Sequence, residues 1–377
     1  MKILITGGAG FIGSNLAKKL IKRGHDLRIL DNFSKQIHGN NQSLDSELDG
    51  VDLIIGDVRN KSVITQSLDD VNAVVHLAAE TGTGQSMYQL EEYQHTNISG
   101  TLNIINHLLH NEHSVEKIIV ASSRAIYGEG RYSCKKHGVI YPDERSEIEM
   151  SNGQFDHKCK LCNRNLEAEA TPENARIAPL SFYGITKQVQ EQIVTMYAKV
   201  LGISGYSLRY QNVYGPGQSL MNPYTGIMAI FSTLARNNQT IRIFEDGNES
   251  RDFVYIDDVI DATIKCLSPD MHGIESFNIG SGNPTSVYKV AESIINNLDS
   301  NSELIITGEY RSGDIRHNYA NLEKSAKDLS FISKTDFNDG LKKFLEWALL
   351  QPDTNLNFES SLQELSDIGL LKKSTGS

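Results

Sequence analysis

The chain has 377 residues, of which 39% are hydrophobic and 22% charged, with 30 glycines and 8 prolines. This composition is typical of a soluble globular protein and excludes a collagen, a coiled coil or a wholly disordered chain. The formal net charge is -11, so we expect no general binding to nucleic acid or to an anionic membrane surface.

Export and membrane insertion are not expected either. No apolar run approaches the roughly 20 residues of a membrane-spanning helix. The N-terminus, MKILITGGAG, lacks the apolar core and cleavage site of a signal peptide. The four cysteines are too few for a disulfide framework. We therefore expect a cytoplasmic protein.

Short apolar runs alternate with amphipathic segments along the first half of the chain. The runs are rich in Ile, Val and Leu and show little alternation, as strands buried on both faces do. Strands are predicted over residues 2–6, 27–30, 51–55, 73–77 and 117–121, and later over 206–209 and 276–279. Helices are predicted between the early strands, as over 14–23 and 97–110. The pattern predicts an α/β fold of the Rossmann type, a doubly wound parallel sheet.

One polar region interrupts this alternation before the sixth strand. Residues 129–178 hold three of the four cysteines and show no clear strand or helix period. We interpret them as an insert in a first domain that comprises residues 1–210.

The second part of the chain is expected to form a smaller lobe, residues 211–350. It begins with clusters of Gly, Pro and Asn around one predicted helix, near 226–235, and returns to the sheet at 276–279. In the tail, residues 351–377, apolar residues at helical spacing over 361–372 predict a docked terminal helix.

The segment TGGAGFIG, residues 6–13, lies between the first predicted strand and a helix. Gly7, Gly10 and Gly13 allow a tight turn, and the helix N-terminus then faces the negative charge of a pyrophosphate. Asp31 ends the next strand, at about the spacing of the carboxylate that binds an adenosine ribose. A carboxylate there repels a 2′-phosphate, which favours NAD over NADP. A plain strand–helix turn with a surface aspartate is the alternative.

Tyr183 and Lys187 are four residues apart on a predicted helix and therefore share one face of it. A nearby cation lowers the pKa of a phenol, so Tyr183 is predicted to act as a base near neutral pH. Ser122 and Ser123 end the fifth predicted strand, and ligands bind at such strand ends in open α/β sheets. The alternatives are an ordinary amphipathic helix and capping serines.

Seven motifs carry a resemblance to a known family. In chain order they are TGGAGFIG, LDNF, GDV, HLAA, SSRAIYG, YGITK and LRYQNVYGPG. They resemble the extended short-chain dehydrogenase/reductase family, and more narrowly its nucleotide-sugar epimerase branch, over about residues 1–350. The resemblance implies a Rossmann domain that binds NAD, a C-terminal substrate-binding lobe and a homodimer. It also implies a catalytic triad of Ser123, Tyr183 and Lys187, with Asn97 as a further member.

The same resemblance implies two sets of binding residues. Those for NAD are Gly7, Gly10, Phe11, Ile12, Gly13, Asp31, Asn32, Asp57, Val58, Leu77, Ala78, Ala79, Asn97, Tyr183, Lys187 and Tyr210. Those for the nucleotide-diphosphate sugar are Ser123, Arg124, Asn212, Arg251, Arg311 and Asp314. Arg251 and Arg311 match arginines on the diphosphate, and Asp314 matches a residue on the nucleotide ribose. Without the resemblance, both arginines would be interpreted as surface ion pairs and Asp57 as a turn carboxylate.

The residues after Ser123 bear on the reaction. Relatives that dehydrate nucleotide sugars carry Asp-Glu there, and decarboxylating relatives carry Glu, whereas this chain has Arg124-Ala125. Neither residue supplies a carboxyl group, which favours an epimerase. The implied hypothesis is that Tyr183 takes the proton of the sugar 4-hydroxyl while C4 passes hydride to NAD. The 4-keto sugar then rotates, and the hydride returns to its other face.

Choice of sugar and nucleotide depends on few side chains. The cysteine-bearing insert and the segments 209–215 and 313–317 look most like dTDP-L-rhamnose 4-epimerases. The main alternative is a UDP-sugar 4-epimerase acting on glucose, glucuronate or N-acetylglucosamine. A dehydrogenase or reductase with net NAD turnover is another, and a dinucleotide-sensing regulator is a third, although such regulators usually lose the Tyr and Lys.

Two short pairs in the insert, Cys134 with His137 and Cys159 with Cys162, have the spacing of a structural zinc site. His157 is an alternative to His137, and a loop with reduced thiols is the alternative to any metal. All four ligands would be protein groups, so the ion would have no open position for catalysis. The fourth cysteine, Cys266, lies in an apolar run and is predicted to be core.

Overall fold

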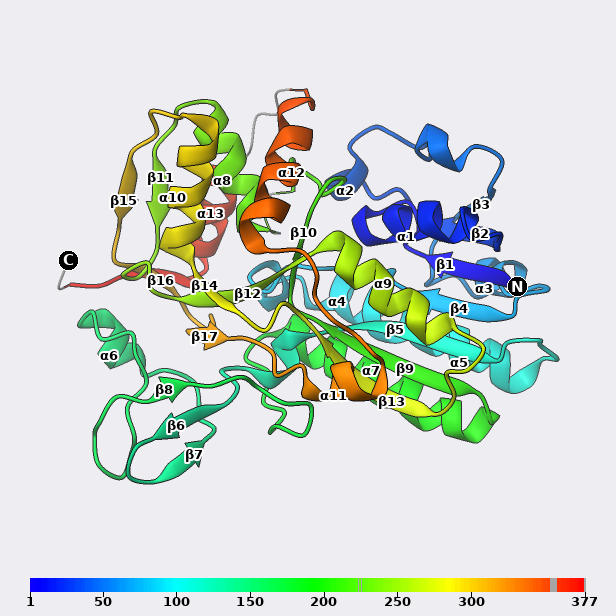
Figure 1. The fold of residues 1–377 in the computed structure, drawn as a ribbon, viewed down its shortest axis with the longest axis horizontal. Helices are drawn as coiled ribbons and strands as arrows, with labels where there is room; N and C mark the ends of the chain where they lie inside the picture. Colours follow the sequence, from blue (N-terminus) through cyan, green and yellow to red (C-terminus); the bar gives the residue numbers. More distant parts are fainter. Residues whose placement is uncertain (223, 225, 353–357, 376–377) are drawn as a thin grey trace.

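The computed structural model describes residues 1–222, 224, 226–352 and 358–375. At its centre is a seven-stranded sheet (Figure 1) in the order β13-β9-β5-β4-β1-β2-β3. Its strands, all parallel, are β1 Lys2–Thr6, β2 Asp26–Asp31, β3 Asp52–Ile55, β4 Ala73–His76, β5 Lys117–Ser123, β9 Ser204–Tyr210 and β13 Ile274–Ile279. Each predicted strand is present, and the predicted doubly wound parallel sheet is confirmed.

Helices cover both faces of this sheet. They are α1 Phe11–Ile21, α3 Lys61–Ser67, α5 Gly100–His110, α7 Phe182–Leu201 and α9 Ile256–Leu267. On one face α1 packs against α9, and on the other α5 packs against α3 and α7. Successive residues of β1 supply the two cores: Ile3 and Ile5 belong to the core under α1 and α9, and Leu4 to that under α5 and α7. Burial on both faces explains why these strands read as continuous apolar runs.

Two of these helices begin away from their predicted starts. α1 begins directly at Phe11, because the glycine turn leads into the helix without a linker. α5 begins at Gly100, after a π-helical turn over Gln94–Ser99 that follows the short helix α4 Leu90–Tyr93. Such turns are often found at functional sites. Another short helix, α2 Lys35–His38, follows β2.

A smaller lobe follows Tyr210. Its helices are α8 Ile227–Arg236, α10 Val287–Leu298 and α12 Phe337–Leu349, whereas α11 Glu323–Asp328 packs against β13 of the main sheet. Its strands are β10 Asn212–Tyr214, β11 Ile241–Ile243, β12 Ser250–Tyr255, β14 Pro284–Ser286, β15 Leu304–Ile306, β16 Glu309–Arg311 and β17 His317–Asn318. β12 pairs with β10, β14 and β17, and β11 pairs with β15.

The chain returns to the main sheet at the predicted place, since β13 adds an edge strand beside β9. Helix α9, which precedes this strand, also packs on the sheet. The domain limits of 1–210, 211–350 and 351–377 stay predictions.

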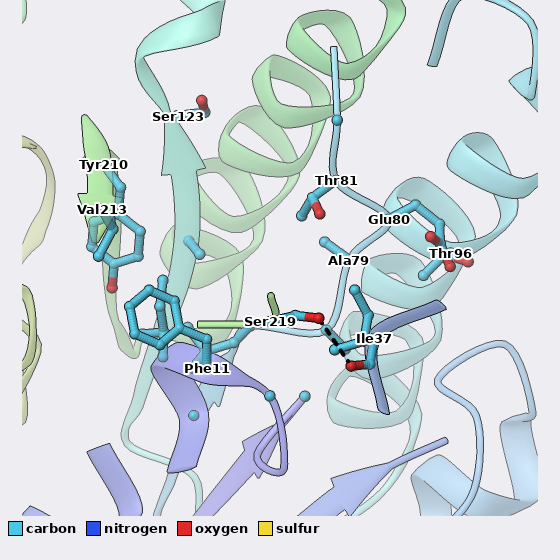
Figure 2. Close-up of a pocket in the computed structure, with 18 of the residues that line it drawn as sticks. Phe11, Ile37, Ala79, Glu80, Thr81, Thr96, Ser123, Tyr210, Val213 and Ser219 are labelled. Atoms are coloured by element: carbon cyan, nitrogen blue, oxygen red, sulfur yellow. Dashed lines mark hydrogen bonds between the residues drawn. The ribbon is translucent and has the colours of Figure 1, made fainter. Parts of the chain in front are cut away.

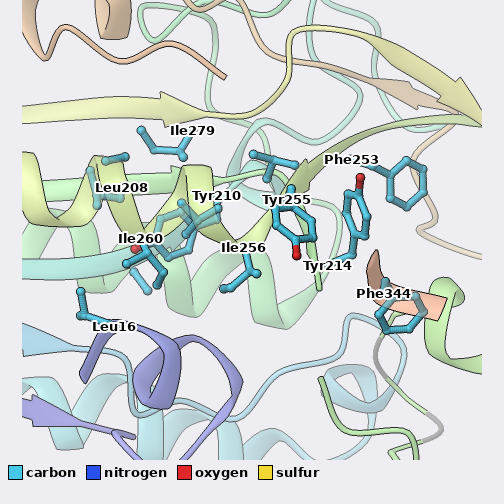
Figure 3. Close-up of a cluster of buried hydrophobic side chains, with 14 of the residues drawn as sticks. Leu16, Leu208, Tyr210, Tyr214, Phe253, Tyr255, Ile256, Ile260, Ile279 and Phe344 are labelled. Atoms are coloured by element: carbon cyan, nitrogen blue, oxygen red, sulfur yellow. The ribbon is translucent and has the colours of Figure 1, made fainter. Parts of the chain in front are cut away.

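One hydrophobic core joins the main sheet to the lobe (Figure 3). Leu16 of α1 and Ile260 of α9 lie at one end of the cluster drawn, and Tyr214, Phe253 and Phe344 of the lobe lie at the other. Because these buried side chains are continuous and close-packed, packing fixes the position of the lobe over the sheet.

The insert lies apart from the main sheet (Figure 1) and has a small sheet of its own. Its strands are β6 Tyr132–Cys134, β7 Gly138–Ile140 and β8 Glu167–Ala168, in the order β7-β6-β8, and its helix is α6 Glu147–Ser151. Strands of two or three residues are too short for a period to be visible in the sequence.

The tail carries helix α13, Phe358–Asp367, and then strand β18, Leu371–Lys373. The predicted helix over 361–372 is therefore right in its first part and wrong in its last, because Gly369 takes a φ of 73° and ends the helix. β18 pairs antiparallel with β16 instead. Residues 353–357 and 376–377 of the predicted tail lie outside the described residues. Among the described helices none is both long and apolar enough to span a membrane.

Candidate functional site

A cavity of about 510 Å³ opens at the carboxyl ends of the central strands. Figure 2 shows Phe11 at the start of α1, Ser123 at the end of β5, and Thr81 and Tyr210 around it. The predicted residues that line it are Gly7, Gly10, Phe11, Ile12, Gly13, Asp31, Asn32, Val58, Leu77, Ala78, Ala79, Ser123, Arg124, Tyr183, Lys187, Tyr210 and Asn212. Five other predicted residues, Asp57, Asn97, Arg251, Arg311 and Asp314, do not line it.

The glycine turn forms a cradle that side chains would fill. Gly7 has a φ of +70°, and a Cβ there would lie 2.7 Å from the backbone nitrogen of Ala78. A Cβ on Gly13 would lie 2.3 Å from the carbonyl oxygen of Gly7. At Gly10, the N-cap of α1, no side chain caps the helix, so its first N–H groups are free to bind an anion.

Asp31, at the end of β2, is buried beside this turn. One carboxylate oxygen accepts a hydrogen bond from the Ala9 N–H, at 3.0 Å, and the other accepts one from the Phe33 N–H, at 2.9 Å. The carboxylate thus holds the glycine turn in place and lines the cavity where a ribose hydroxyl could reach it.

Two predicted cofactor residues lie behind the cavity wall. Asp57 accepts hydrogen bonds from Asn32 and Arg59, at 3.0 and 2.9 Å, while its neighbour Val58 lines the cavity. The buried carboxamide of Asn97 bonds to both backbone groups of Glu80, at 2.8 and 3.1 Å. Asn97 therefore shapes the loop after β4 rather than the cavity surface.

Helix α7 begins against the loop that follows β5. Ser181 caps it, since its hydroxyl accepts a hydrogen bond from the Gly184 N–H at 3.1 Å. A Cβ on Gly184 would lie 2.7 Å from the carbonyl oxygen of Ala125, so glycine lets the helix start touch this loop. The contact brings Tyr183 to the end of β5.

The three predicted catalytic side chains meet at one end of the cavity. The Ser123 hydroxyl lies near enough to the phenol of Tyr183 to oppose the rise in its pKa, and it accepts a hydrogen bond from the Ala125 N–H at 3.1 Å. Lys187 Nζ lies 5.8 Å from the centroid of the Tyr183 ring and donates to the carbonyl oxygen of Ala121, at 3.0 Å. The hydroxyl of the neighbouring Ser122 instead donates to the Glu191 carboxylate, at 2.8 Å.

Burial dominates the titration of this group. It raises the pKa of Tyr183, although the nearby Ser123 hydroxyl and the charge of Arg124 oppose the rise. Burial lowers the pKa of Lys187 to about 7. The sequence predicts a lowered pKa for Tyr183, and in the protein alone the direction is the reverse. The reason is that the phenolate is desolvated beside a lysine that is itself only partly charged near neutral pH.

Lys187→Met is expected to stabilise the NAD-free protein at and below neutral pH. The pKa of Lys187 is about 7 in the folded protein and about 10.4 in an unfolded chain. Between these values the unfolded chain holds the additional proton, so the wild-type free energy of unfolding rises with pH. The gain should be on the order of 1–5 kcal/mol at about pH 6 and shrink by about pH 9.5. Urea denaturation of both proteins at the two pH values checks this, and a gain that does not shrink with pH would contradict it.

The predicted diphosphate and ribose residues form a charged cluster next to the cavity. Arg251 donates to the Asp314 carboxylate at 3.0 Å. Burial alone would raise the pKa of Asp314, but the positive charges of Arg251, Arg311, Arg145 and Arg124 hold it at about 2. One guanidinium nitrogen of Arg124, which lines the cavity, and Nε of Arg311 are buried without a hydrogen-bond partner among the described residues. Such groups suit an anionic ligand.

Several cavity residues are missing from the sequence predictions. Gln211 is 5% exposed, lines the cavity, and has no hydrogen-bond partner among the described residues for either amide atom. The segment Thr81–Thr83 and the residues Gln218 and Tyr224 also line the cavity. Gln211 lies between two predicted residues of the motif LRYQNVYGPG, and this position in the motif could have identified it as a cavity residue.

The four predicted metal ligands come together in the insert. Their ligand atoms all lie within 4.8 Å of one another. Cys134 Sγ lies 3.6 Å from Cys162 Sγ and 3.6 Å from His137 Nδ1, and His137 Nδ1 lies 3.2 Å from Cys159 Sγ. Around a tetrahedral zinc, ligand sulfurs are about 3.8 Å apart and sulfur and nitrogen about 3.5 Å apart. The donor set and spacing therefore fit zinc.

The alternative ligand His157 is turned away from this cluster. Its Nε2 lies 3.2 Å from a carboxylate oxygen of Glu129, and both side chains are buried. Cys266 is fully buried in α9, as predicted, and burial raises the pKa of its thiol to about 12.

Comparison with known proteins places this geometry in a family. The sequence profile of the NAD dependent epimerase/dehydratase family matches residues 3–147 and 161–280. The chain is 36% identical over 354 residues to dTDP-L-rhamnose 4-epimerase of Burkholderia thailandensis, covering 93% of this chain and 96% of that protein. The short unmatched stretch between the two profile segments falls in the insert.

Two solved structures share the fold. UDP-glucose 4-epimerase of Thermotoga maritima, solved with UDP-glucose, is 27% identical and has a TM-score of 0.74. The match covers 93% of this chain and 99% of that one. UDP-glucuronic acid 4-epimerase of Bacillus cereus, solved with UDP-glucuronic acid and NAD, is 26% identical and has a TM-score of 0.72. The match covers 92% of this chain and 98% of that one. The chain therefore belongs to the NAD dependent epimerase/dehydratase family, the nucleotide-sugar epimerase branch of the extended short-chain dehydrogenases/reductases.

Proposed function

We propose that the protein is an NAD-dependent 4-epimerase of a nucleotide-diphosphate sugar, and that dTDP-L-rhamnose and its C4 epimer, dTDP-6-deoxy-L-talose, are its substrate pair. The observation that carries the proposal is the meeting of Ser123, Tyr183 and Lys187 at the end of a cavity whose other side is the glycine turn. The similar Burkholderia protein bears the name of this activity.

Each of the three side chains has a role that its contacts support. The Tyr183 phenol takes the proton of the sugar 4-hydroxyl and later returns it. The Ser123 hydroxyl, which lines the cavity together with that phenol, holds the reacting oxygen in place. Lys187 supplies positive charge near the ring. Next to Ser123 stand Arg124 and Ala125, which supply no carboxyl group for elimination.

The cradle fits NAD. The glycine turn leaves room that side chains would fill, and the uncapped start of α1 suits a pyrophosphate. Asp31 suits an unphosphorylated ribose. When bound in this cradle, NAD would supply the hydride acceptor and donor that inversion at C4 requires. Because burial raises the pKa of Tyr183 in the protein alone, the phenolate depends on positive charge brought into the cavity.

Incubation with dTDP-L-rhamnose, UDP-glucose, UDP-glucuronate and UDP-N-acetylglucosamine in turn tests the proposal, with NMR to report the C4 epimer. We expect epimerisation of the dTDP sugar without added NAD and without a lasting absorbance rise at 340 nm. Turnover of a UDP sugar alone would favour the alternative substrate class. A lasting rise at 340 nm would favour a dehydrogenase.

We further propose that Cys134, His137, Cys159 and Cys162 hold a structural zinc ion. Their ligand atoms have the spacing of a tetrahedral site, and the small cluster of buried apolar residues around them offers little other stabilisation.

All four cysteines of the chain are free thiols in the structure, which supports the predicted cytoplasmic location. Cell fractionation would test that location.

We also propose that two copies pair through α5 and α7. These helices pack against each other and expose apolar side chains, Leu102 and Leu109 on α5 and Met196 and Val200 on α7. Exposed apolar residues on neighbouring helices favour an interface. Analytical ultracentrifugation should give the mass of a dimer, and a monomer at micromolar concentration would overturn this.

A further inference from the structure

A buried network of charges joins the insert to the lobe. Arg145, from the insert, donates two parallel hydrogen bonds to the Glu245 carboxylate, each of 2.8 Å. Arg316 donates to the same carboxylate, also at 2.8 Å. The three side chains are 8%, 4% and 1% exposed. Charged groups as buried as these are retained only with close partners, so the network is a fixed part of the fold.

A third bond extends this network to the charged cluster beside the cavity. The second terminal nitrogen of Arg145 also donates to the backbone carbonyl oxygen of Asp314, at 2.9 Å. The Asp314 side chain in turn accepts a hydrogen bond from Arg251, at 3.0 Å. Asp314 is therefore held by Arg145 at its backbone and by Arg251 at its carboxylate.

The loop that contains Asp314 lies against the start of the catalytic helix. At Gly313, where φ is +76°, a Cβ would lie 2.9 Å from the carbonyl oxygen of Leu180, just before α7. The insert holds this loop at a second point, because a carboxylate oxygen of Glu129 accepts a hydrogen bond from the Arg316 N–H at 2.9 Å. The insert thus fixes the loop on one side while α7 limits it on the other.

The place of Arg145 in the insert makes it a suitable anchor. It lies in the loop between His137 and Cys159, whose ends are brought together by the cysteine–histidine cluster. The hydrogen bonds of Arg145 to Glu245 and to Asp314 then hold the middle of this loop. Arginine also suits the position, because its planar fork makes two parallel bonds to Glu245 and a third to Asp314, an arrangement that the single nitrogen of a lysine cannot reproduce.

We infer that Arg145 is a positioning residue for the nucleotide-diphosphate end of the substrate: it holds Asp314, and through it Arg251, in the arrangement that binds the ligand. This inference rests on the proposed function. By this inference the insert contributes to substrate binding, although neither Arg145 nor the cysteine–histidine cluster of the insert lines the cavity.

Arg145→Lys and Arg145→Met test the inference in the full chain. Arg176→Met is the matched control, because Arg176 is an exposed arginine of the same insert and pairs with Asp143 at 2.8 Å. For each protein we would measure KM and kcat for the nucleotide sugar, the calorimetric affinity for dTDP and for UDP, the affinity for NAD, and bound zinc. Binding of the nucleoside diphosphates reports on the loop without any turnover.

Arg145→Lys is the decisive variant, because it keeps the buried positive charge and is expected to fold. We expect KM to rise roughly tenfold and the affinity for the preferred diphosphate to fall by a similar factor. The kcat should stay within about threefold, as for a loss of uniform binding, while NAD affinity, zinc and the control stay unchanged. Arg145→Met should show the larger rise in KM.

Unchanged KM and diphosphate affinity in Arg145→Lys would overturn the inference. So would an equal loss of NAD and diphosphate affinity, which indicates general unfolding. If the wild type binds neither dTDP nor UDP and epimerises none of the four sugars, it is the proposed function that fails, and the inference falls with it. If the wild type binds a nucleoside diphosphate and Arg145→Lys binds it equally well, the inference is wrong and the proposed function is unaffected.

Discussion

Tyr183→Phe is expected to lower kcat for epimerisation by roughly 10³-fold, while folding and NAD binding stay as in the wild type. The substitution removes only the hydroxyl. The ring keeps its place 5.8 Å from Lys187 Nζ and its edge-on contact with the Tyr93 ring, whose centroid is 6.4 Å away. The variant therefore loses the proposed acceptor of the sugar proton without losing packing.

A second phenol provides the control. Tyr214 is buried in the lobe outside the cavity, and its hydroxyl donates to the carbonyl oxygen of Phe337 at 3.2 Å. Tyr214→Phe should keep kcat within about twofold, since it removes one hydrogen bond remote from the chemistry. NMR time courses of the C4 epimer and NAD titrations measure both variants. Turnover by Tyr183→Phe within about tenfold of wild type would show that another group is the base.

The main sheet could be predicted because its information is local. Each strand is a short apolar run buried on both faces, as Ile3, Leu4 and Ile5 of β1 show. The cradle could be predicted for the same reason, since the need for glycine at Gly7 and Gly13 arises within one strand–helix turn and the strand beside it.

Side-chain direction within a motif could not be predicted. In the segment Gly56-Asp57-Val58, both Gly56 and Val58 line the cavity, but the carboxylate of Asp57 turns to Asn32 and Arg59. Whether the side chain of Asp57 points toward the cavity or away from it depends on hydrogen-bond partners from other parts of the chain. The raised pKa of Tyr183 was missed for a similar reason, because burial depends on the whole fold rather than on the helical spacing to Lys187.

The insert shows both limits together. The grouping of Cys134, His137, Cys159 and Cys162 could be predicted from spacing alone, since the residues of each pair are separated by two others. The choice between His137 and His157 could not be predicted. It depends on Glu129, which is far from His157 in sequence but contacts its imidazole and so keeps it away from the cysteines. The link from Arg145 to Asp314 joins positions 169 residues apart and was likewise invisible in the sequence.

Removal of the proposed zinc ion is expected to loosen the insert and to cost most of its stability. Cys159→Ser should abolish the one zinc ion per chain that atomic absorption is expected to find in protein purified without chelator. Lys135 and Lys160 are exposed in the insert, and trypsin should cleave there roughly tenfold faster or more once the metal is gone. Since Arg145 lies between the two ligand pairs, KM for the nucleotide sugar should rise as well, with NAD affinity unchanged.

Cys266→Ala is the matched control for this loss. Cys266 is the cysteine of α9, fully buried and outside the cluster of Cys134, Cys159 and Cys162. Its replacement removes a small buried group and should cost on the order of 1 kcal/mol in free energy of unfolding, with zinc content and trypsin sensitivity of the insert unchanged. Protein free of zinc from the start, or a Cys159→Ser variant as resistant to trypsin as the wild type, would show that the thiols hold no metal. In that case the buried charges around Glu129 and Glu245, rather than an ion, would have to keep the insert in place.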